Sequence, residues 1–581
     1  MLSDPSAILV SPKPGRRVDG RIFKIGLLAD GTTSSKYVFE LARWIALRDD
    51  MQAVLILHPA NRAIADRPFR GQLTRLFRHG RRFGVLPTLS RLFSKILFRG
   101  IVGLERIRLK KNVRHTDHFS SFDLLSVVSK NIAIAPIISK SGFVYRFSEP
   151  DIQRVKDLDC DILVRCGSGI LKGGILSAAR FGILSFHHAD NRINRGIPAA
   201  FWEVYSRQET TGFTIQVLTE ELDGGIVLMR GHLPTRSYFQ LNEASVYERS
   251  NYYLKVLING IVSRGTLPDA LPSVPYSDRL YRYPNTWQTV TYALNQLSYR
   301  ARNMANRLRG RDLRWGVAFL HSVWRGAALW RGVEIRNPPF HFLADPFVVT
   351  KGGKSFCFME DFDYMRGRGE IAVYELCEDR AVRAGVALSE AFHLSFPYIF
   401  EYQGQLFMCP ETHKNRDIRI YRCHDFPLGW TLERVIMQNV SAGDTMIFER
   451  NGRWWMFTNI DPVDGDDHCS ELSIFHAASP FGDWTPHTNN PILVDASRAR
   501  NAGLLRDGEK LFRVSQGQGF DLYGRQALIN EILELTESTY REDCVAQVTP
   551  HFKNDICGTH HMHSDGSITV FDYLRRSLIS S

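Results

Sequence analysis

The chain has 581 residues and a formal net charge of +12, with 44% hydrophobic and 23% charged residues. This length exceeds what one hydrophobic core organises, and the composition excludes a disordered chain, so we expect roughly three folded units. No apolar run reaches the roughly 18 residues of a membrane-spanning helix, and residues 1–21 lack the apolar core of a signal peptide. The nine cysteines are scattered without a CxxC pair, which favours reduced thiols and a cytoplasmic protein.

The positive charge is concentrated in one stretch. Residues 62–115 contain fifteen Lys or Arg but only two acids, Asp66 and Glu105. Within this stretch, residues 89–99 alternate basic and apolar side chains at roughly helical spacing. We therefore expect a basic helical insertion, which either packs its apolar stripe on its own domain or makes peripheral contact with an anionic membrane surface. Nucleic acid is not an expected partner, because no nucleic-acid-binding motif accompanies the charge.

On both sides of this insertion the sequence alternates between strands and helices. Apolar runs predict strands at residues 23–28, 53–57, 162–164, 182–186 and 214–218. Helices are expected at residues 37–47, 171–179 and 242–262. This alternation predicts an open parallel α/β sheet of Rossmann-like type over residues 22–265. The turn after the first strand has too few glycines for a dinucleotide-binding fingerprint.

The second half of the chain differs from the first in residue composition and in its pattern of predicted elements. Residues 267–284 are rich in Pro, Ser and Tyr, which is typical of a linker. An Arg-rich sequence with a helical pattern follows to about residue 330, so we expect a linker and helical region at 266–330. Beyond it, strand pairs joined by a Gly-containing turn recur roughly every 50 residues, near residues 345–360, 397–408, 445–457, 502–512 and 560–570. This repeat predicts an all-β five-bladed propeller over residues 331–581, with a β-sandwich as the alternative.

Several separate motifs of the first half carry a family resemblance. Gly182-Ile183-Leu184-Ser185-Phe186-His187 is followed by Arg195-Gly196, then by Thr211-Gly212-Phe213-Thr214-Ile215 and by Leu222-Asp223-Gly224-Gly225. In their order and spacing, these motifs resemble the family that includes the methionyl-tRNA, phosphoribosylglycinamide and sugar N-formyltransferases. The resemblance covers roughly residues 22–265. It implies that formyl-tetrahydrofolate is the cosubstrate and that an amino group is the acceptor.

The resemblance also assigns roles to single residues. His187 would stabilise the oxyanion that develops on the formyl group, and Asp223 would handle the proton that leaves the attacking amine. Ser185 stands where the family has a catalytic Asn, and a hydroxyl offers one donor in place of a planar amide. Four more residues would border the acceptor site: Arg195, Gly196, His188 and Asp190. A metal site at His187, His188 and Asp190 is not expected, because adjacent residues of a strand point to opposite faces.

The repeat region carries a second resemblance. Leu343-Ala344-Asp345-Pro346-Phe347, Glu360-Asp361-Phe362-Asp363 and Cys409-Pro410-Glu411-Thr412 resemble the propellers of certain glycoside hydrolases and, more closely, the N-terminal domain of plant glucosamine inositolphosphorylceramide transferases. Acids near a propeller axis can cleave or transfer a sugar, hydrogen-bond its hydroxyls, or only cap strands. The candidate acids are Asp345, Glu360, Glu411 and Asp444. The hydrolases carry a Glu on the fourth blade, where residues 498–503 offer Arg and Asn instead.

Together the two resemblances imply an enzyme that transfers a formyl group to an amino sugar, in nucleotide- or lipid-linked form, during surface-polysaccharide synthesis. One alternative is a glycosyltransferase or glycosidase centred on the propeller, with a degenerate first domain. Another alternative is a non-enzymatic glycan-binding scaffold at the membrane surface, which would use the basic insertion.

Overall fold

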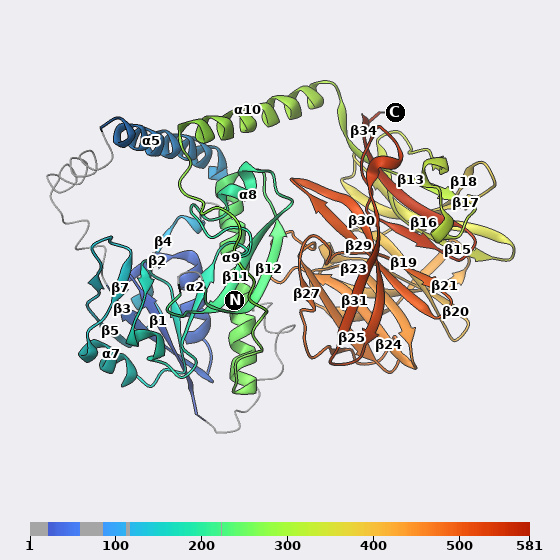
Figure 1. Ribbon diagram of the computed structural model, residues 1–581. Helices are drawn as coiled ribbons and strands as arrows, with labels where there is room; N and C mark the ends of the chain where they lie inside the picture. The colour runs from blue at the N-terminus through green and yellow to red at the C-terminus, as the bar shows by residue number, and fades with distance from the viewer. Residues whose placement is uncertain (1–20, 59–84, 112–116, 222–223, 581) are drawn as a thin grey trace. The chain divides into compact units, whose positions relative to one another are not determined.

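The computed structural model describes residues 21–58, 85–111, 117–221 and 224–580. These residues form two compact units, which meet in sequence between Ser298 and Tyr299. The first unit holds the described residues up to 298 apart from 232–234, and the second holds residues 232–234 and 299–580. Both units are drawn in Figure 1.

A seven-stranded sheet forms the centre of the first unit, in the order β12-β11-β10-β8-β1-β3-β5. The bounds are β1 (Phe23–Ala29), β3 (Met51–Leu57), β5 (Asn131–Ala133), β8 (Ile162–Arg165), β10 (Ile183–His187), β11 (Thr210–Val217) and β12 (Ile226–Pro234). The five strands from β10 to β5 pair in parallel, while β11 runs antiparallel to β10. The chain moves outward in one direction from β1 to β3 and in the other from β1 to β8, so a topological switch point lies beside β1.

Helices and short strands surround this sheet. The helices are α2 (Lys36–Ala46), α5 (Val85–Arg108), α7 (Glu149–Lys156), α8 (Phe201–Tyr205), α9 (Phe239–Arg264) and α10 (Thr286–Leu308). The short strands are β2 (Thr33–Ser35), β4 (Ser121–Asp123), β6 (Ile137–Ile138), β7 (Val144–Arg146) and β9 (Ile170–Leu171). In α2 the buried residues are Val38, Leu41, Ala42 and Ile45, which form the apolar stripe that the sequence predicts. The helix expected at residues 171–179 is absent from that described stretch: β9 is followed by a 3-10 turn at Gly174–Ser177, because two glycines disfavour a longer helix.

Five blades make up the second unit, each a sheet of four principal strands. The first two contain β15 (His341–Lys351), β16 (Lys354–Asp363), β17 (Arg368–Leu376), β18 (Ala381–Leu388), β19 (Ser395–Tyr402), β20 (Gln405–Glu411), β21 (Asp417–Asp425) and β22 (Gly429–Gln438). The next two contain β23 (Ala442–Arg450), β24 (Arg453–Ile460), β25 (Glu471–Ala477), β26 (Thr485–Pro486), β27 (Leu493–Val494), β28 (Asn501–Asp507), β29 (Lys510–Gly519), β30 (Leu522–Leu535) and β31 (Tyr540–Val548). The innermost strands β15, β19, β23, β28 and β33 contact one another in a closed ring, as in a β-propeller.

Both ends of the second unit build the fifth blade. It contains β13 (Arg311–Leu320), β14 (Val333–Ile335), β32 (Ile556–Gly558), β33 (Met562–Ser564) and β34 (Thr569–Leu578). β13 pairs antiparallel with β34 from Arg311–Leu578 to Leu320–Thr569. This pairing closes the ring by joining segments from the two ends of the unit. The helical region that we expected up to about residue 330 therefore ends at Leu308, and β13 already belongs to the propeller.

Candidate functional site

Polar side chains gather at the carboxyl edge of the parallel sheet in the first unit. Asp30 follows β1, His58 follows β3, Arg165 ends β8 and His187 ends β10. In open α/β sheets this edge, at the switch point, is where ligands bind. The first unit therefore has one natural place for a site, and Ser185 and His187 of the formyltransferase motifs lie there.

Ser185 and His187 lie two residues apart on β10 and so share one face of the sheet. The Ser185 side chain is buried and its Oγ donates to the Phe186 carbonyl at 3.2 Å. Nε2 of His187 lies 2.8 Å from the Asn194 carbonyl oxygen. A carbonyl only accepts, so Nε2 carries the hydrogen and Nδ1 of the neutral ring keeps a lone pair. Neutral His187 can therefore accept a proton at Nδ1, whereas the oxyanion role that we expected requires the imidazolium. Asp223 lies outside the described residues.

His188 and Asp190 have partners within the unit. The His188 ring stacks on Tyr247 with centroids 3.6 Å apart and planes 9° apart, and burial holds the pKa of His188 well below its ordinary value. Asp190 is 2% exposed and forms ion pairs with Arg192 at 2.6 Å and Arg230 at 3.2 Å. These contacts give both residues a structural role, and their expected contact with a substrate stays a prediction.

Arg195 and Gly196 hold the linker. Arg195 Nε donates to the Asn191 carbonyl at 2.7 Å, and its guanidinium lies 4.5 Å from the centroid of the Tyr276 ring. A Cβ on Gly196 would lie 2.2 Å from the Tyr281 carbonyl oxygen, so only glycine fits here. Gly196, which we expected to border the acceptor site, therefore makes its close approach to the chain's own linker.

Sequence reasoning missed a second cluster at this edge. The Asp30 carboxylate accepts hydrogen bonds from Ser168 N at 2.9 Å and Ser168 Oγ at 3.0 Å. His58 is fully buried, with Nδ1 3.6 Å from Asp30 Oδ1, and neither ring nitrogen has a hydrogen-bond partner among the described residues. Burial lowers the pKa of His58. The sequence feature that could have indicated this cluster was a polar residue directly after each buried strand, Asp30 after β1 and His58 after β3.

In the second unit, the innermost strands share one irregularity. The register shifts between Ala344 and Phe347 in β15, and equivalent shifts occur in β19, β23 and β28. At this bulge Asp345 has φ 51°, and Asp444 in β23 has φ 45°. Such strained positions persist where the surrounding structure enforces them, and bulges re-aim side chains near functional sites. The bulges therefore bring Asp345 and Asp444 to the same end of the propeller axis.

The neighbouring strands supply two more acids at that end. Glu360 in β16 pairs with Ala344, and Glu411 in β20 pairs with Ser395, which are equivalent positions of the first two blades. All four acids predicted from the sequence are thus buried around the axis.

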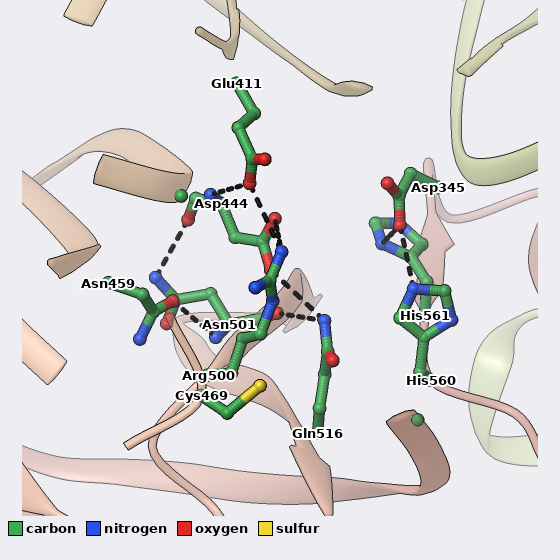
Figure 2. A network of polar contacts seen from close by, with 12 residues as sticks. Asp345, Glu411, Asp444, Asn459, Cys469, Arg500, Asn501, Gln516, His560 and His561 are labelled. Carbon is green, nitrogen blue, oxygen red and sulfur yellow. Dashed lines mark hydrogen bonds and ion pairs between the residues drawn. The ribbon is translucent and has the colours of Figure 1, made fainter. Parts of the chain in front are cut away.

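Arg500 binds two of these acids (Figure 2). Its Nε lies 2.6 Å from Asp444 Oδ2 and its Nη2 lies 3.2 Å from Glu411 Oε2. Asn501 and Gln516 complete the surroundings of Asp444: Asn501 Nδ2 donates to its carbonyl at 2.9 Å, and Gln516 Nε2 donates to its Oδ2 at 3.1 Å. Burial opposes ionisation of Glu411, but His413 and Arg500 hold its pKa well below the ordinary value.

A histidine binds the third acid. His560 Nε2 lies 3.2 Å from Asp345 Oδ1, and His560 Nδ1 lies 2.7 Å from Asp572 Oδ2. Burial alone would lower the pKa of His560, but the two carboxylates raise it to about 10. Burial likewise opposes ionisation of Asp345, yet the hydrogen bond from His560 lowers its pKa. At neutral pH, Asp345 is therefore a carboxylate and His560 an imidazolium.

The fourth acid, Glu360, has a histidine as its ion-pair partner, at a longer distance than the partners of the other three. Its Oε1 lies 3.6 Å from His393 Nε2, and His393 Nδ1 accepts a hydrogen bond from Gly369 N at 2.8 Å. Burial, followed by the charges of Asp345 and Glu411, raises the pKa of Glu360 well above its ordinary value. The surroundings of Glu360 thus favour its protonated form, whereas those of Asp345 favour the carboxylate.

Aromatic rings lie near these groups. Tyr523 is 38% exposed, and the Arg500 guanidinium lies 5.1 Å from its ring centroid. The centroid of the Trp315 ring lies 4.0 Å from the ring centroid of His560 and 6.1 Å from that of Tyr523. Aromatic faces beside carboxylates and amides are typical of sugar-binding sites.

Among the described residues, Asp345, His560 and Asp572 place ligand atoms within 4.8 Å of one another, a spacing that would suit a metal ion. Because His560 already contacts a carboxylate through each ring nitrogen, its imidazolium form neutralises one of these two negative charges without a metal. Sequence reasoning missed His560, Asp572, His393 and Arg500. The sequence features that could have indicated them were the His560-His561-Met562-His563 run, for His560, and the absence of the fourth-blade Glu, for Arg500.

Comparison with known proteins supports the propeller resemblance. Residues 328–564 match the family described as glucosamine inositolphosphorylceramide transferase 1, N-terminal. The chain is 34% identical over 256 residues to a protein of that name from Oryza sativa subsp. japonica, which covers 43% of this chain and 33% of the relative. This chain thus spans about a third of the length of that plant relative.

The first half has a shorter match, 34% identical over 84 residues, to methionyl-tRNA formyltransferase from Deinococcus radiodurans. It covers 14% of this chain and 26% of the relative, so it supports the first resemblance in part. Among solved structures, the catalytic domain of a Coprinopsis cinerea GH62 α-L-arabinofuranosidase matches with a TM-score of 0.32 at 12% identity, over 46% of this chain and 97% of that chain.

Proposed function

We propose that the protein is a transferase acting on carbohydrate and that the axis of its propeller is the sugar site. One observation carries this proposal: Asp345 and Glu360 are buried together at the axis with different partners, His560 and His393, and these surroundings shift their pKa values in opposite directions. Pairs of titratable groups whose environments push their pKa values apart are the pattern of acid–base catalysis.

In this mechanism Glu360 and Asp345 act on the two sides of one bond. As the C–O bond of the sugar donor breaks, Glu360 gives its proton to the departing oxygen. The hydroxyl of the acceptor forms the new C–O bond and transfers its proton to Asp345. His560 and Asp572 hold the Asp345 carboxylate in place, and Tyr523 and Trp315 offer faces for the sugar ring.

Arg500 favours transfer over ordinary hydrolysis. It stands on the fourth blade, where the hydrolases that the propeller resembles carry a Glu, and it engages Asp444 and Glu411 as ion-pair partners. We further propose that the sugar is an amino sugar or is carried on a lipid. The name of the plant relatives, which combines glucosamine with inositolphosphorylceramide, supports this substrate class.

The test combines binding and turnover. The intact protein is incubated with nucleotide-linked glucosamine, with nitrophenyl glycosides and with glycosylated phospholipid, and the products are followed by mass spectrometry. We expect turnover that Asp345→Asn and Glu360→Gln each reduce by about a hundredfold or more. Asp379→Asn, whose side chain is 81% exposed, and Glu509→Gln, in an exposed turn, are the matched controls. Full activity in Glu360→Gln would contradict the mechanism, and sugar binding without turnover would leave the axis as a recognition site.

Formyl transfer in the first unit is a second candidate function. The 84-residue match and the placement of Ser185 and His187 on one face of β10 favour it. We propose formyl-tetrahydrofolate as the cosubstrate and an amino sugar as the acceptor. His187 Nδ1 would take the proton that leaves the attacking amine. The buried Ser185 is a weaker substitute for the family's Asn, since one lost donor typically slows acyl transfer by about 10²–10³-fold.

This second function has its own assay. Release of tetrahydrofolate is measured with a panel of amino sugars for the wild type, for His187→Ala and for the exposed control His424→Ala. Turnover in the wild type and in His424→Ala, but not in His187→Ala, is the expected result. Turnover that survives in His187→Ala removes His187 from the mechanism.

A further inference from the structure

The long helix α5 and the first turns of α10 are attached to the first unit, each through one face of the helix. Ser94 Oγ in α5 lies 2.7 Å from Thr286 Oγ1 at the start of α10. Tyr292 OH in α10 donates to Glu105 Oε2 in α5 at 2.6 Å, and Glu105 Oε1 accepts from Gln240 N in α9 at 2.8 Å. These buried hydrogen bonds hold the two helices beside each other (Figure 1).

The other face of α5 is apolar and exposed. Ser94, Phe98 and Glu105 mark the buried face, at spacings of four and seven residues. The exposed apolar residues are Leu89 at 55%, Leu92 at 39%, Phe93 at 57%, Ile96 at 60%, Leu104 at 69% and Ile107 at 61%. At 3.6 residues per turn these six fall on one stripe, opposite the buried face. The amphipathic helix expected in the basic insertion is therefore present, but its apolar stripe faces outward.

α10 repeats this arrangement. Its buried residues Thr289 and Tyr292 lie on the side of the first unit. In its part that belongs to the first unit, up to residue 298, the exposed apolar residues are Trp287 at 74%, Leu294 at 57% and Leu297 at 58%. Their spacings of seven and three residues place them on one stripe.

The charges of both helices have one sign. From Val85 to Lys111 the basic residues are Arg91, Lys95, Arg99, Arg106, Arg108, Lys110 and Lys111, and the one acid, Glu105, is 5% exposed. α10 contains three arginines and no Asp or Glu. Helices that face water normally mix the two signs in pairs three or four residues apart. An exposed apolar stripe flanked only by cations fits an anionic, partly apolar surface.

We propose that the exposed stripe of α5 and that of residues 286–298 of α10, called here the helix pair surface, bind the interface of a membrane rich in anionic lipid. The apolar side chains enter the boundary between headgroups and acyl chains, and the Lys and Arg side chains contact lipid phosphates. No described helix is long and apolar enough to cross a membrane, so the contact is with one leaflet. A second copy of the chain is disfavoured as the occupant because both surfaces carry the same charge. This inference does not depend on the proposed chemistry of the propeller.

Vesicle flotation of the intact protein tests the proposal. We expect binding to phosphatidylcholine vesicles that contain about 30 mol% phosphatidylglycerol and little binding to pure phosphatidylcholine, with a loss at high salt. Phe93→Glu combined with Ile96→Glu, and separately Trp287→Glu combined with Leu294→Glu, should each lower the bound fraction by about tenfold. Met365→Glu combined with Val382→Glu places the same charges on apolar propeller residues that are 80% and 47% exposed, and this control should bind like the wild type.

Because all substituted residues are exposed, thermal unfolding should show unchanged stability in each variant. Equal flotation of the wild type and the helix variants would overturn the proposal. So would light scattering that shows a dimer converted to a monomer by Phe93→Glu with Ile96→Glu, since the surface would then bind a second copy. Lys95→Gln combined with Arg99→Gln should reduce flotation with anionic vesicles, and an unchanged bound fraction would contradict the electrostatic part.

Discussion

The Arg500 guanidinium lies 2.6 Å from Asp444, and the two side chains are 12% and 2% exposed. An ion pair this deep in the propeller is not a surface bridge of marginal value. Removal of one partner leaves an uncompensated charge in a medium that solvates it poorly. The same cation also neutralises Glu411, so Arg500 holds together the acids of two blades.

We therefore predict that Arg500→Met destabilises the propeller by about 3–5 kcal/mol, the range for breaking a buried pair. Denaturant or thermal unfolding of the intact protein measures the loss. Arg325→Met is the matched control, because Arg325 pairs with Asp507 at 49% exposure on both sides and should contribute below about 1 kcal/mol. Equal stability of the two variants would show that Arg500 is not the link between the acids.

His560 makes the stability of the propeller depend on pH. Its pKa in the folded protein is about 10 against about 6.5 for an ordinary histidine, so folding favours the protonated ring. A group with a raised folded pKa contributes its full stability below about pH 6.5 and loses it as the pH rises toward about 10. We predict that His560→Gln lowers the melting temperature most at pH 6 to 7 and that the difference narrows by about pH 10.

A bound metal would change this result. If a divalent ion rather than a proton linked Asp345, His560 and Asp572, the chelator EDTA would lower the melting temperature of the wild type and zinc would restore it. We expect neither effect, and the pH series on His560→Gln without added metal distinguishes the two cases.

The sequence indicated the acids at the propeller axis but not the groups that set their protonation. Asp345, Glu360, Glu411 and Asp444 each lie within a repeated strand pair, so the period of the repeat predicted that they converge. His560 and Arg500 reach these acids from other blades, across 215 and 56 residues of sequence. Such contacts depend on how the ring closes, which no local pattern encodes.

The closing strand itself shows the same limit. Residues 311–320 follow an Arg-rich helix, and their local strand partner, β14, has only three residues, so the local pattern predicts a continued helical region. They form β13 because their partner, β34, begins at Thr569. In the first unit the local signals were stronger: the buried runs of β1 and β3 and the stripe of α2 follow from periodicity alone.

His58 should make the first unit sensitive to acid. Burial lowers the pKa of His58 in the folded state, so the unfolded chain binds the proton more readily. Stability therefore falls as the pH drops below about 6.5, the value for an unfolded histidine. We predict that His58→Phe, which keeps a ring in the buried space, reduces the loss of melting temperature between pH 7 and pH 5.

Asp30 offers the contrasting variant. Its Oδ1 lies 3.6 Å from His58 Nδ1, so Asp30→Asn removes a nearby negative charge that favours a protonated His58. Asp30→Asn should therefore steepen the acid sensitivity that His58→Phe relieves. Identical pH profiles for wild type and His58→Phe would assign the acid response to other groups.

Gly196 determines whether the linker can dock on the first unit. A Cβ at this position would lie 2.2 Å from the Tyr281 carbonyl oxygen and 2.6 Å from its carbonyl carbon, and both are backbone atoms that cannot rotate away. The linker must then shift, which also strains the hydrogen bond from Ile197 N to the Tyr281 carbonyl at 3.3 Å. We predict that Gly196→Ala destabilises the first unit by about 1–3 kcal/mol, the usual cost of overpacking.

Gly31→Ala is the control, since a Cβ there meets nothing within 4 Å. Limited proteolysis supplies the readout that separates local undocking from general destabilisation: cleavage within residues 267–284 should accelerate in Gly196→Ala and stay at the wild-type rate in Gly31→Ala. If the rate of cleavage is unchanged while formyl transfer is lost, Gly196 would instead be assigned to the acceptor site. In that case the glycine would be required by a substrate that approaches the loop, as its family motif implies, and the contact with Tyr281 would be incidental.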